Sequence, residues 1–173
     1  PGGTLVLNAD DRLLRSRAAG LAQRYGRAPR IAWFALDAGS EVLVAERAAG
    51  GATCGVRDGR LLLHADGVDH DLGAVASMPL TVEGSATYNV ANLAGAALVA
   101  WALGVPPGTV ASVAATFGAR AADNAGRMMR FEVRGVRVLV DYAHNPEGIR
   151  GLLQVAKHLQ REGGRLGMIL GHA

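Results

Sequence analysis

The side chains best suited to chemistry in this sequence gather in the segment Asp141–Asn145, which holds a carboxylate, a phenol, an imidazole and an amide. The segment follows the apolar run Val136–Val140, and Pro146 comes directly after it. We expect a strand to end before Asp141 and a helix to begin at Pro146, with Asn145 as its N-cap. Free N–H groups and the helix dipole at such a junction favour hydroxyl and phosphate ligands. A capped turn in which Asp141 satisfies backbone groups explains the same residues equally well.

A second polar cluster follows the short apolar run Thr4–Leu7. We interpret its side chains, Asn8, Asp10 and Asp11, as caps rather than metal ligands. Asp11 suits the N-cap of a helix that keeps its apolar residues on one face and ends at Gly26. The run from Arg30 to Leu36 then predicts another buried strand, so this part of the chain is expected to form a βαβ unit with parallel strands.

Between Glu41 and about Leu80 the pattern changes to short β-rich runs separated by turns. Asp58-Gly59 and Asp66-Gly67 each lie between two such runs, which is the strongest short sequence signal for a hairpin. We therefore expect a small antiparallel meander attached to the α/β unit. The predicted strands are Glu41–Ala45, Ala52–Arg57, Leu61–Ala65 and Val68–Leu72.

Helical periodicity returns between Thr87 and Gly104. Asn89 and Asn92 lie three residues apart near the start of this helix, so we expect them to share a face different from the buried apolar stripe. A second helix follows Pro107. The predicted stripe consists of Val90, Leu93, Ala94, Ala97, Leu98 and Trp101.

The segment from Gly118 to Arg130 is rich in small residues and weakly periodic, which makes it the candidate domain junction. Beyond it, Arg134-Gly135 predicts the turn of a hairpin. After the helix that begins at Pro146, the apolar run Leu166–Leu170 predicts a further strand that completes a second βαβ unit. Each unit would then have only one or two parallel strands, whereas such sheets usually contain more. Either the chain is part of a larger protein, or partner segments in a homo-oligomer supply the missing strands.

Composition and charge exclude several classes of protein. The 18 basic and 15 acidic residues are scattered along the chain, so a nucleic-acid surface is not expected. Cys54 is the only cysteine, which rules out an internal disulfide, and we interpret it as a small strand residue rather than a nucleophile. The longest apolar stretch, from Leu93 to about Pro106, is too short for a membrane helix. We expect a soluble, cytoplasmic protein that has no membrane partner.

Three strings in this order and spacing resemble the Mur ligase superfamily. That group contains the peptidoglycan stem-peptide ligases, folylpolyglutamate synthase and the ligase half of cyanophycin synthetase, and the chain is most similar to the last of these. The most specific part is the Asp-Tyr-Ala-His-Asn-Pro string with an upstream Gly-Arg and an Asn-x-x-Asn pair. The strings are NADD at 8–11, YNVANLAGAALVAWALG at 88–104 and GRMMRFEVRGVRVLVDYAHNP at 126–146.

The resemblance implies an α/β fold in two parts. Residues 1–120 would be the C-terminal part of a central ATP-binding domain, with a mixed or parallel sheet and the meander. Residues 121–173 would be the first part of a Rossmann-like C-terminal domain. The resemblance also implies a ligase that uses ATP and Mg²⁺ to convert a carboxylate to an acyl phosphate, which the amine of an amino acid then attacks to form an amide. The partners would be ATP, a carboxylate acceptor and an amino acid.

The resemblance further assigns nucleotide-binding roles to two asparagines. Asn92 matches the asparagine that hydrogen-bonds adenine, and Asn89 lies beside it. An amide suits this role because it both donates to and accepts from a base edge. Helix capping and hydrogen bonding to neighbouring strands are the simpler alternative for this pair.

Four residues near the second polar string are assigned in the same way. Arg127 matches the arginine of the Gly-Arg motif, which reaches ribose or phosphate, and Asp141 matches the aspartate that holds the ribose hydroxyls. His144 and Asn145 would lie near the nucleotide or the acyl phosphate. An interdomain salt bridge for Arg127 and a satisfied turn for His144 are the alternatives.

The sequence lacks one part that this chemistry requires. No glycine-rich loop ending in Gly-Lys-Ser/Thr is present to hold the β- and γ-phosphates, and Lys157, the only lysine, lies in a predicted C-terminal helix. We therefore expect no catalysis from this chain alone, and we assign none of its residues a catalytic or metal-binding role. A non-catalytic nucleotide-binding or regulatory α/β module is the alternative function.

Overall fold

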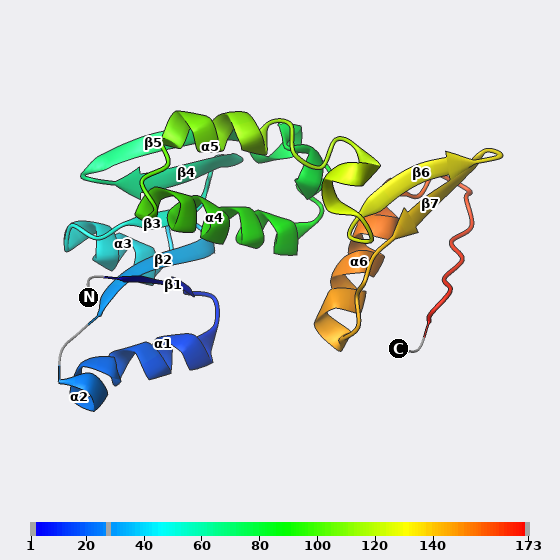
Figure 1. Cartoon of the computed structure of the whole chain (residues 1–173). Coiled ribbons are helices and arrows are strands. Elements are labelled where there is room, and N and C mark those ends of the chain that lie inside the picture. Colours follow the sequence, from blue (N-terminus) through cyan, green and yellow to red (C-terminus); the bar gives the residue numbers. More distant parts are fainter. Residues whose placement is uncertain (1–2, 27–28, 172–173) are drawn as a thin grey trace. The chain divides into compact units, whose positions relative to one another are not determined.

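The computed structural model describes residues 3–26 and 29–171, and the chain forms two compact units, Pro1–Phe117 and Gly118–Ala173. The first unit is built on a five-stranded sheet and the second on a two-stranded sheet. Both units combine helices with strands, so the predicted α/β class is confirmed (Figure 1). Within the described residues, no helix has the length and apolar character needed to cross a bilayer.

The sheet of the first unit combines parallel and antiparallel pairing. Its strands lie in the order β1-β2-β3-β4-β5, in which β1, β2 and β3 are parallel and β3, β4 and β5 are antiparallel. The predicted βαβ unit is present, and three of the four predicted meander strands form β3, β4 and β5. Both parts share one sheet because Trp33 of β2 pairs with Thr53 of β3. The strands are β1 Thr4–Asn8, β2 Arg30–Asp37, β3 Thr53–Arg57, β4 Arg60–Ala65 and β5 Val68–Ala74.

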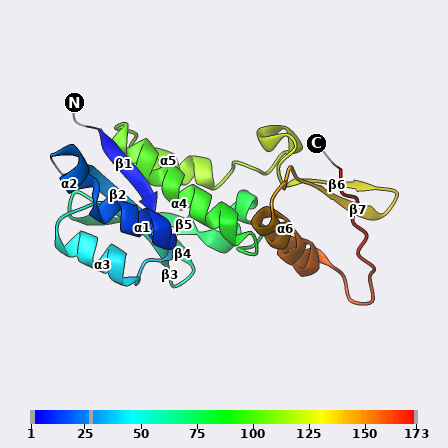
Figure 2. The ribbon, with the colours of Figure 1, turned by 90° about the horizontal axis from the view of Figure 1, so that it is seen from below.

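Helices cover both faces of this sheet (Figures 1 and 2). Side chains alternate along a strand, and in β2 Ala32 and Phe34 join the core beneath α4, whereas Trp33 and Ala35 join the core beneath α3. Two short 3-10 turns, Val75–Ser77 and Pro79–Thr81, lead from β5 into α4. The helices are α1 Arg12–Ala19, α2 Leu21–Tyr25, α3 Glu41–Ala48, α4 Thr87–Ala102 and α5 Pro107–Ala114.

Local signals set the bounds of the first helical segment. Asp11 caps α1, because its Oδ1 accepts hydrogen bonds from the backbone N–H groups of Leu13 at 2.8 Å and Leu14 at 3.1 Å. Gly26 ends α2 with a left-handed φ of 72°, which glycine adopts without strain. The single helix predicted here is divided at Gly20, where the chain leaves α1 and enters α2.

The strand predicted at Glu41–Ala45 is wrong, because these residues form the first part of α3. Two β-branched residues, Val42 and Val44, favoured the strand interpretation. However, β2 and β3 are parallel, and parallel neighbours need a crossover connection, usually a helix. Leu43 decides the packing, since its side chain is fully buried against the Trp33 side of the sheet.

The larger core of the first unit lies between the sheet and α4. Four of the six residues of the predicted stripe are buried, and Leu93 and Trp101 pack beside them. Cys54 is a fully buried residue of β3, as predicted, and burial raises the pKa of its thiol. A thiol with a raised pKa carries little thiolate, which agrees with a packing role.

A polar network joins the three antiparallel strands. The carboxylate of Asp69 accepts a hydrogen bond from Arg57 Nη2 at 3.0 Å and lies 2.7 Å from His64 Nδ1. Arg60 Nε donates to Asp71 Oδ2 at 2.5 Å. The hydrogen bonds from His64 and Arg57 hold the pKa of Asp69 below its ordinary value.

This lowered pKa predicts a small acid-sensitive contribution to stability. A carboxyl group whose pKa is lower in the folded state stabilises the fold above its unfolded-state pKa, and the contribution is lost as the pH falls below about 4. We expect Asp69→Asn to cost about 1 kcal/mol or less at neutral pH, as is usual for exposed ion pairs, and to cost less at about pH 3. Urea unfolding at both pH values measures this. An equal cost at both pH values would contradict the assignment. The control is Asp58→Asn, in the exposed turn between β3 and β4.

The second unit contains a hairpin and one long helix. Arg134 and Gly135 form the predicted turn with positive φ values of 50° and 78°. The elements are the 3-10 turn Ala121–Asn124, β6 Met129–Val133, β7 Val136–Val140 and α6 Pro146–Leu159.

The strand predicted at Leu166–Leu170 is wrong, since this segment has no regular structure. The prediction rested on apolar composition, whereas a strand also requires a hydrogen-bonded neighbour. Among the described residues of this unit, β7 pairs only with β6. The segment is instead exposed, with Ile169 99% accessible. The second βαβ unit is therefore not formed.

Candidate functional site

Asp141 connects the end of β7 with the segment that leads into β6. Its Oδ2 accepts a hydrogen bond from the backbone N–H of Met128 at 2.9 Å. Met128 is buried and adopts a left-handed φ of 49°, which is unusual for a residue with a side chain. The carboxylate thus holds the neighbouring Gly126-Arg127 segment in a fixed turn at the end of the hairpin.

Arg127 lies at the same end of the hairpin. The central carbon of its guanidinium group is 5.6 Å from the ring centroid of Tyr142, within the range of a cation–π contact. Because Tyr142 follows Asp141 directly, Arg127 and Asp141 lie at the same end of the hairpin, one before β6 and the other after β7. Both residues had been predicted as nucleotide ligands.

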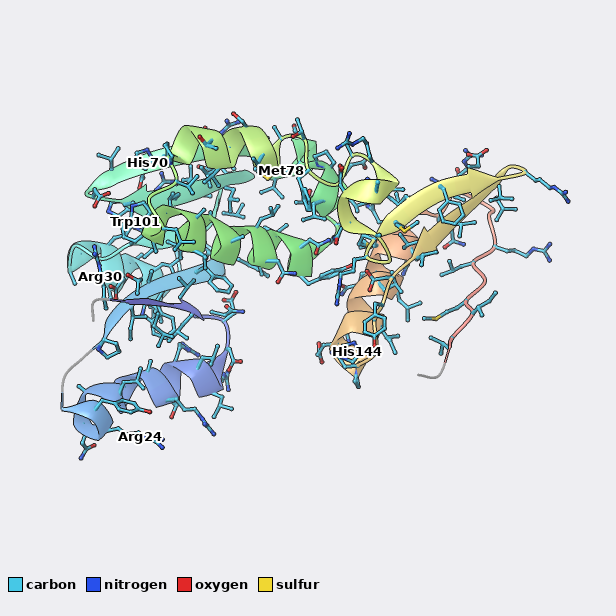
Figure 3. All side chains as sticks on the ribbon, in the orientation of Figure 1. Arg24, Arg30, His70, Met78, Trp101 and His144 are labelled. Atoms are coloured by element: carbon cyan, nitrogen blue, oxygen red, sulfur yellow. The ribbon has the colours of Figure 1, made fainter. Side chains whose placement is uncertain are left out.

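His144 and Asn145 lie between this loop and α6, and Figure 3 shows His144 next to the start of that helix. His144 is exposed, and its Nδ1 is 3.2 Å from the carbonyl oxygen of Tyr142. Asn145 Oδ1 accepts a hydrogen bond from the N–H of Gly148 at 2.8 Å, so the predicted N-cap is confirmed. A ligand role for either side chain stays a prediction.

The two asparagines of α4 differ in their surroundings. Asn89 is buried, and its Nδ2 donates to the carbonyl oxygen of Leu80 at 2.9 Å. Asn92 is exposed. Asn89 is buried because the turn that precedes α4 covers it, so the two asparagines differ in accessibility. Of the pair, Asn92 is the one whose amide is open to a ligand.

The polar cluster after β1 makes backbone contacts. Asn8 Oδ1 accepts from Asp10 N at 2.9 Å, and Asp10 Oδ2 accepts from the N–H of Leu36 in β2 at 2.8 Å. With the cap made by Asp11, these bonds confirm that the cluster stabilises the strand ends. Within residues 3–26 and 29–171, no group of three or more His, Cys, Asp or Glu side chains is arranged to hold a metal ion.

Two comparisons place these residues among known proteins. Residues 126–173 match the family described as Mur ligase, glutamate ligase domain. The chain is 33% identical over 146 residues to the cyanophycin synthetase of Nostoc sp. (strain PCC 7120), which covers 84% of this chain. It is also 33% identical over 161 residues to the UDP-N-acetylmuramate–L-alanine ligase of Kineococcus radiotolerans, which covers 91% of it.

The chain is related to the Mur ligases. The predicted resemblance, including the similarity to cyanophycin synthetase, is thereby confirmed. A third relative, the cyanophycin synthetase of Crocosphaera subtropica, is 30% identical over 98% of the chain. The chain spans 16% of the length of the Nostoc protein and 29% of the Kineococcus protein.

The Mur ligase match contains four of the six predicted site residues, namely Arg127, Asp141, His144 and Asn145. Asn89 and Asn92 lie in the first unit. The sequence-based predictions did not include the contacts of Met128 with Asp141 and of Tyr142 with Arg127, although the register of the hairpin indicates both. Met129 pairs with Val140, so continuing the register outward places Met128 opposite Asp141 and Arg127 opposite Tyr142.

Proposed function

We propose that this Mur ligase relative supplies part of the nucleotide-binding surface of an ATP-dependent carboxylate–amine ligase. The observation that supports this most is the fixed loop at the end of β7. There Asp141 holds Met128, the residue next to Arg127, and the Arg127 guanidinium contacts the ring of Tyr142. The N-capped start of α6 follows Tyr142 closely, and all these residues lie inside the matched Mur ligase region.

The loop has the chemistry that a nucleoside phosphate requires. A carboxylate has two acceptor oxygens, so Asp141 can hold Met128 through Oδ2 and accept ribose hydroxyls through the other. Arg127 supplies a planar cation that binds phosphate through two N–H groups. The loop is fixed before the nucleotide binds, because the Met128 contact and the α6 cap need no ligand. This preorganisation lowers the entropic cost of binding.

The proposed reaction is amide formation through an acyl phosphate. ATP supplies the phosphoryl group, and Mg²⁺ accompanies its phosphates, as is usual for this ion. The substrates are a carboxylate acceptor and an amino acid, in a cyanophycin synthetase-like or peptidoglycan-precursor-like ligase. In this proposal residues 1–120 belong to the central domain and residues 121–173 to the C-terminal domain of such an enzyme.

Asn92 provides a direct test of nucleotide binding. We expect Asn92→Ala to weaken ATP binding by the full-length protein about tenfold, because an exposed amide that contacts adenine contributes about 1–1.5 kcal/mol. Stability should be unchanged, since the side chain is exposed. Isothermal titration with ATP gives the affinity. Ser112→Ala on the exposed side of α5 is the control, and unchanged affinity in Asn92→Ala would exclude the adenine contact.

Phosphate release separates a ligase from a binding module. A ligase should release phosphate from ATP only when both a carboxylate acceptor and an amino acid are present. A full-length protein that binds ATP but releases no phosphate with any such pair would instead support the non-catalytic module.

A further inference from the structure

The first unit has a pocket at the edge of its sheet opposite to the Asn8–Asp11 cluster. Thr4 and Arg30 begin the parallel strands β1 and β2, and both line this pocket. Asp66, in the turn between β4 and β5, and Trp101, near the end of α4, complete its polar wall. The pocket has a volume of about 460 Å³, which is sufficient for a small organic molecule.

Two opposite charges meet the same indole ring in this pocket. The guanidinium carbon of Arg30 is 5.4 Å from the centroid of the Trp101 ring, and Trp101 Nε1 donates to Asp66 Oδ2 at 3.2 Å. Figure 3 shows Arg30 and Trp101 at the same end of the unit. None of the ion pairs found among the described residues joins Arg30 to Asp66. The two charges therefore contact the same ring without forming a direct ion pair with each other.

The rest of the wall adds to this polarity. The C-terminal end of α4 reaches the pocket at Ala102, and a helix C-terminus carries partial negative charge. A purely anionic ligand would therefore meet Asp66 and the helix end, whereas a purely cationic ligand would meet Arg30. A ligand with one charge of each sign suits all three groups. Val105, Pro106 and Pro107 provide an apolar surface beside them.

We propose that this pocket binds a free α-amino acid. Its carboxylate pairs with Arg30, its ammonium group with Asp66 and the end of α4, and its side chain contacts the two prolines. The pocket lies at the amino-terminal edge of the sheet, and the polar cluster Asn8–Asp11 follows the carboxyl end of β1. Within α4, Trp101 lies at the C-terminal end, whereas Asn92, the predicted adenine contact, lies in the first half of the helix. The proposed site is thus separate from that contact and independent of the proposed ligase activity.

The test is a titration of the 173-residue chain with each of the twenty common L-amino acids. Binding is measured by isothermal titration and by the change in Trp101 fluorescence. The other tryptophan, Trp33, is buried and does not line the pocket. The tightest ligand is then compared with its N-acetyl derivative and its methyl ester, each of which lacks one charge. We expect both derivatives to bind at least about tenfold more weakly, because each leaves one protein charge unpaired.

Variants test the same contacts from the protein side. Arg30→Gln and Asp66→Asn should each weaken binding of the tightest amino acid about tenfold or more. Arg24→Gln is the control for Arg30, since Arg24 makes a similar contact with Tyr25 outside the pocket, and Asp58→Asn is the control for Asp66 in a similar turn. Absence of saturable binding by all twenty amino acids would overturn the proposal. Equal binding of the tightest ligand and its two derivatives, which needs no protein variant, would also overturn it.

Discussion

Replacing Asp141 with asparagine in the full-length protein is expected to weaken ATP binding about 10- to 100-fold. A hydrogen bond to a charged group contributes about 1.5–3 kcal/mol, which corresponds to this range. Asparagine keeps one acceptor oxygen for the N–H of Met128, so the loop is retained. The other acceptor is replaced by an NH₂ group, which cannot accept the ribose hydroxyls.

Asp141→Ala separates the two roles of this carboxylate. It removes the contact to Met128 as well, so we expect it to lower the stability of the second unit by about 1–3 kcal/mol in addition to weakening binding. Isothermal titration with ATP gives the affinities, and thermal unfolding gives the stabilities. Glu132→Gln, an exposed carboxylate of β6 in the same unit, is the control. Wild-type affinity in Asp141→Asn would remove the ribose contact from the proposal.

Leu63→Ala is expected to destabilise the first unit by about 2–5 kcal/mol, the range observed for large-to-small changes in protein cores. Leu63 is fully buried in β4 and belongs to the core cluster that includes residues of α4. Truncation removes one methine and two methyl carbons and leaves a cavity in the layer between helix and sheet.

Urea unfolding monitored by circular dichroism measures this loss. The matched control is Leu103→Ala, because Leu103 is the same residue type but is 78% exposed just after α4. We expect the control to change stability by about 0.5 kcal/mol or less. Similar losses in the two variants would show that the sheet and α4 do not form the core described for this unit.

Several elements could be predicted because their signals are local. Asp11 and Asn145 cap helices through backbone N–H groups two or three residues away, and the Asp58-Gly59 and Arg134-Gly135 turns rely on their own backbone preferences. Such interactions depend on a few neighbouring residues. The sequence therefore predicts these caps and turns without knowledge of the tertiary structure.

The errors occurred where a distant partner decides the outcome. Glu41–Ala45 has residues that favour a strand, but the crossover between β2 and β3 makes it helical. Leu166–Leu170 has the composition of a strand but no neighbour to pair with among the described residues. The accessibility of the two asparagines could not be predicted either, because Asn89 is buried by its contact with the carbonyl of Leu80.

The sequence by itself determined the α/β class, most turns and caps, and the relation to Mur ligases, because each depends on short strings or on local backbone preference. Only the tertiary structure decided that Arg30, Asp66 and Trp101 meet in one pocket. These contacts join residues well separated along the chain. Their positions follow from strand order and helix packing, which no short stretch of sequence specifies.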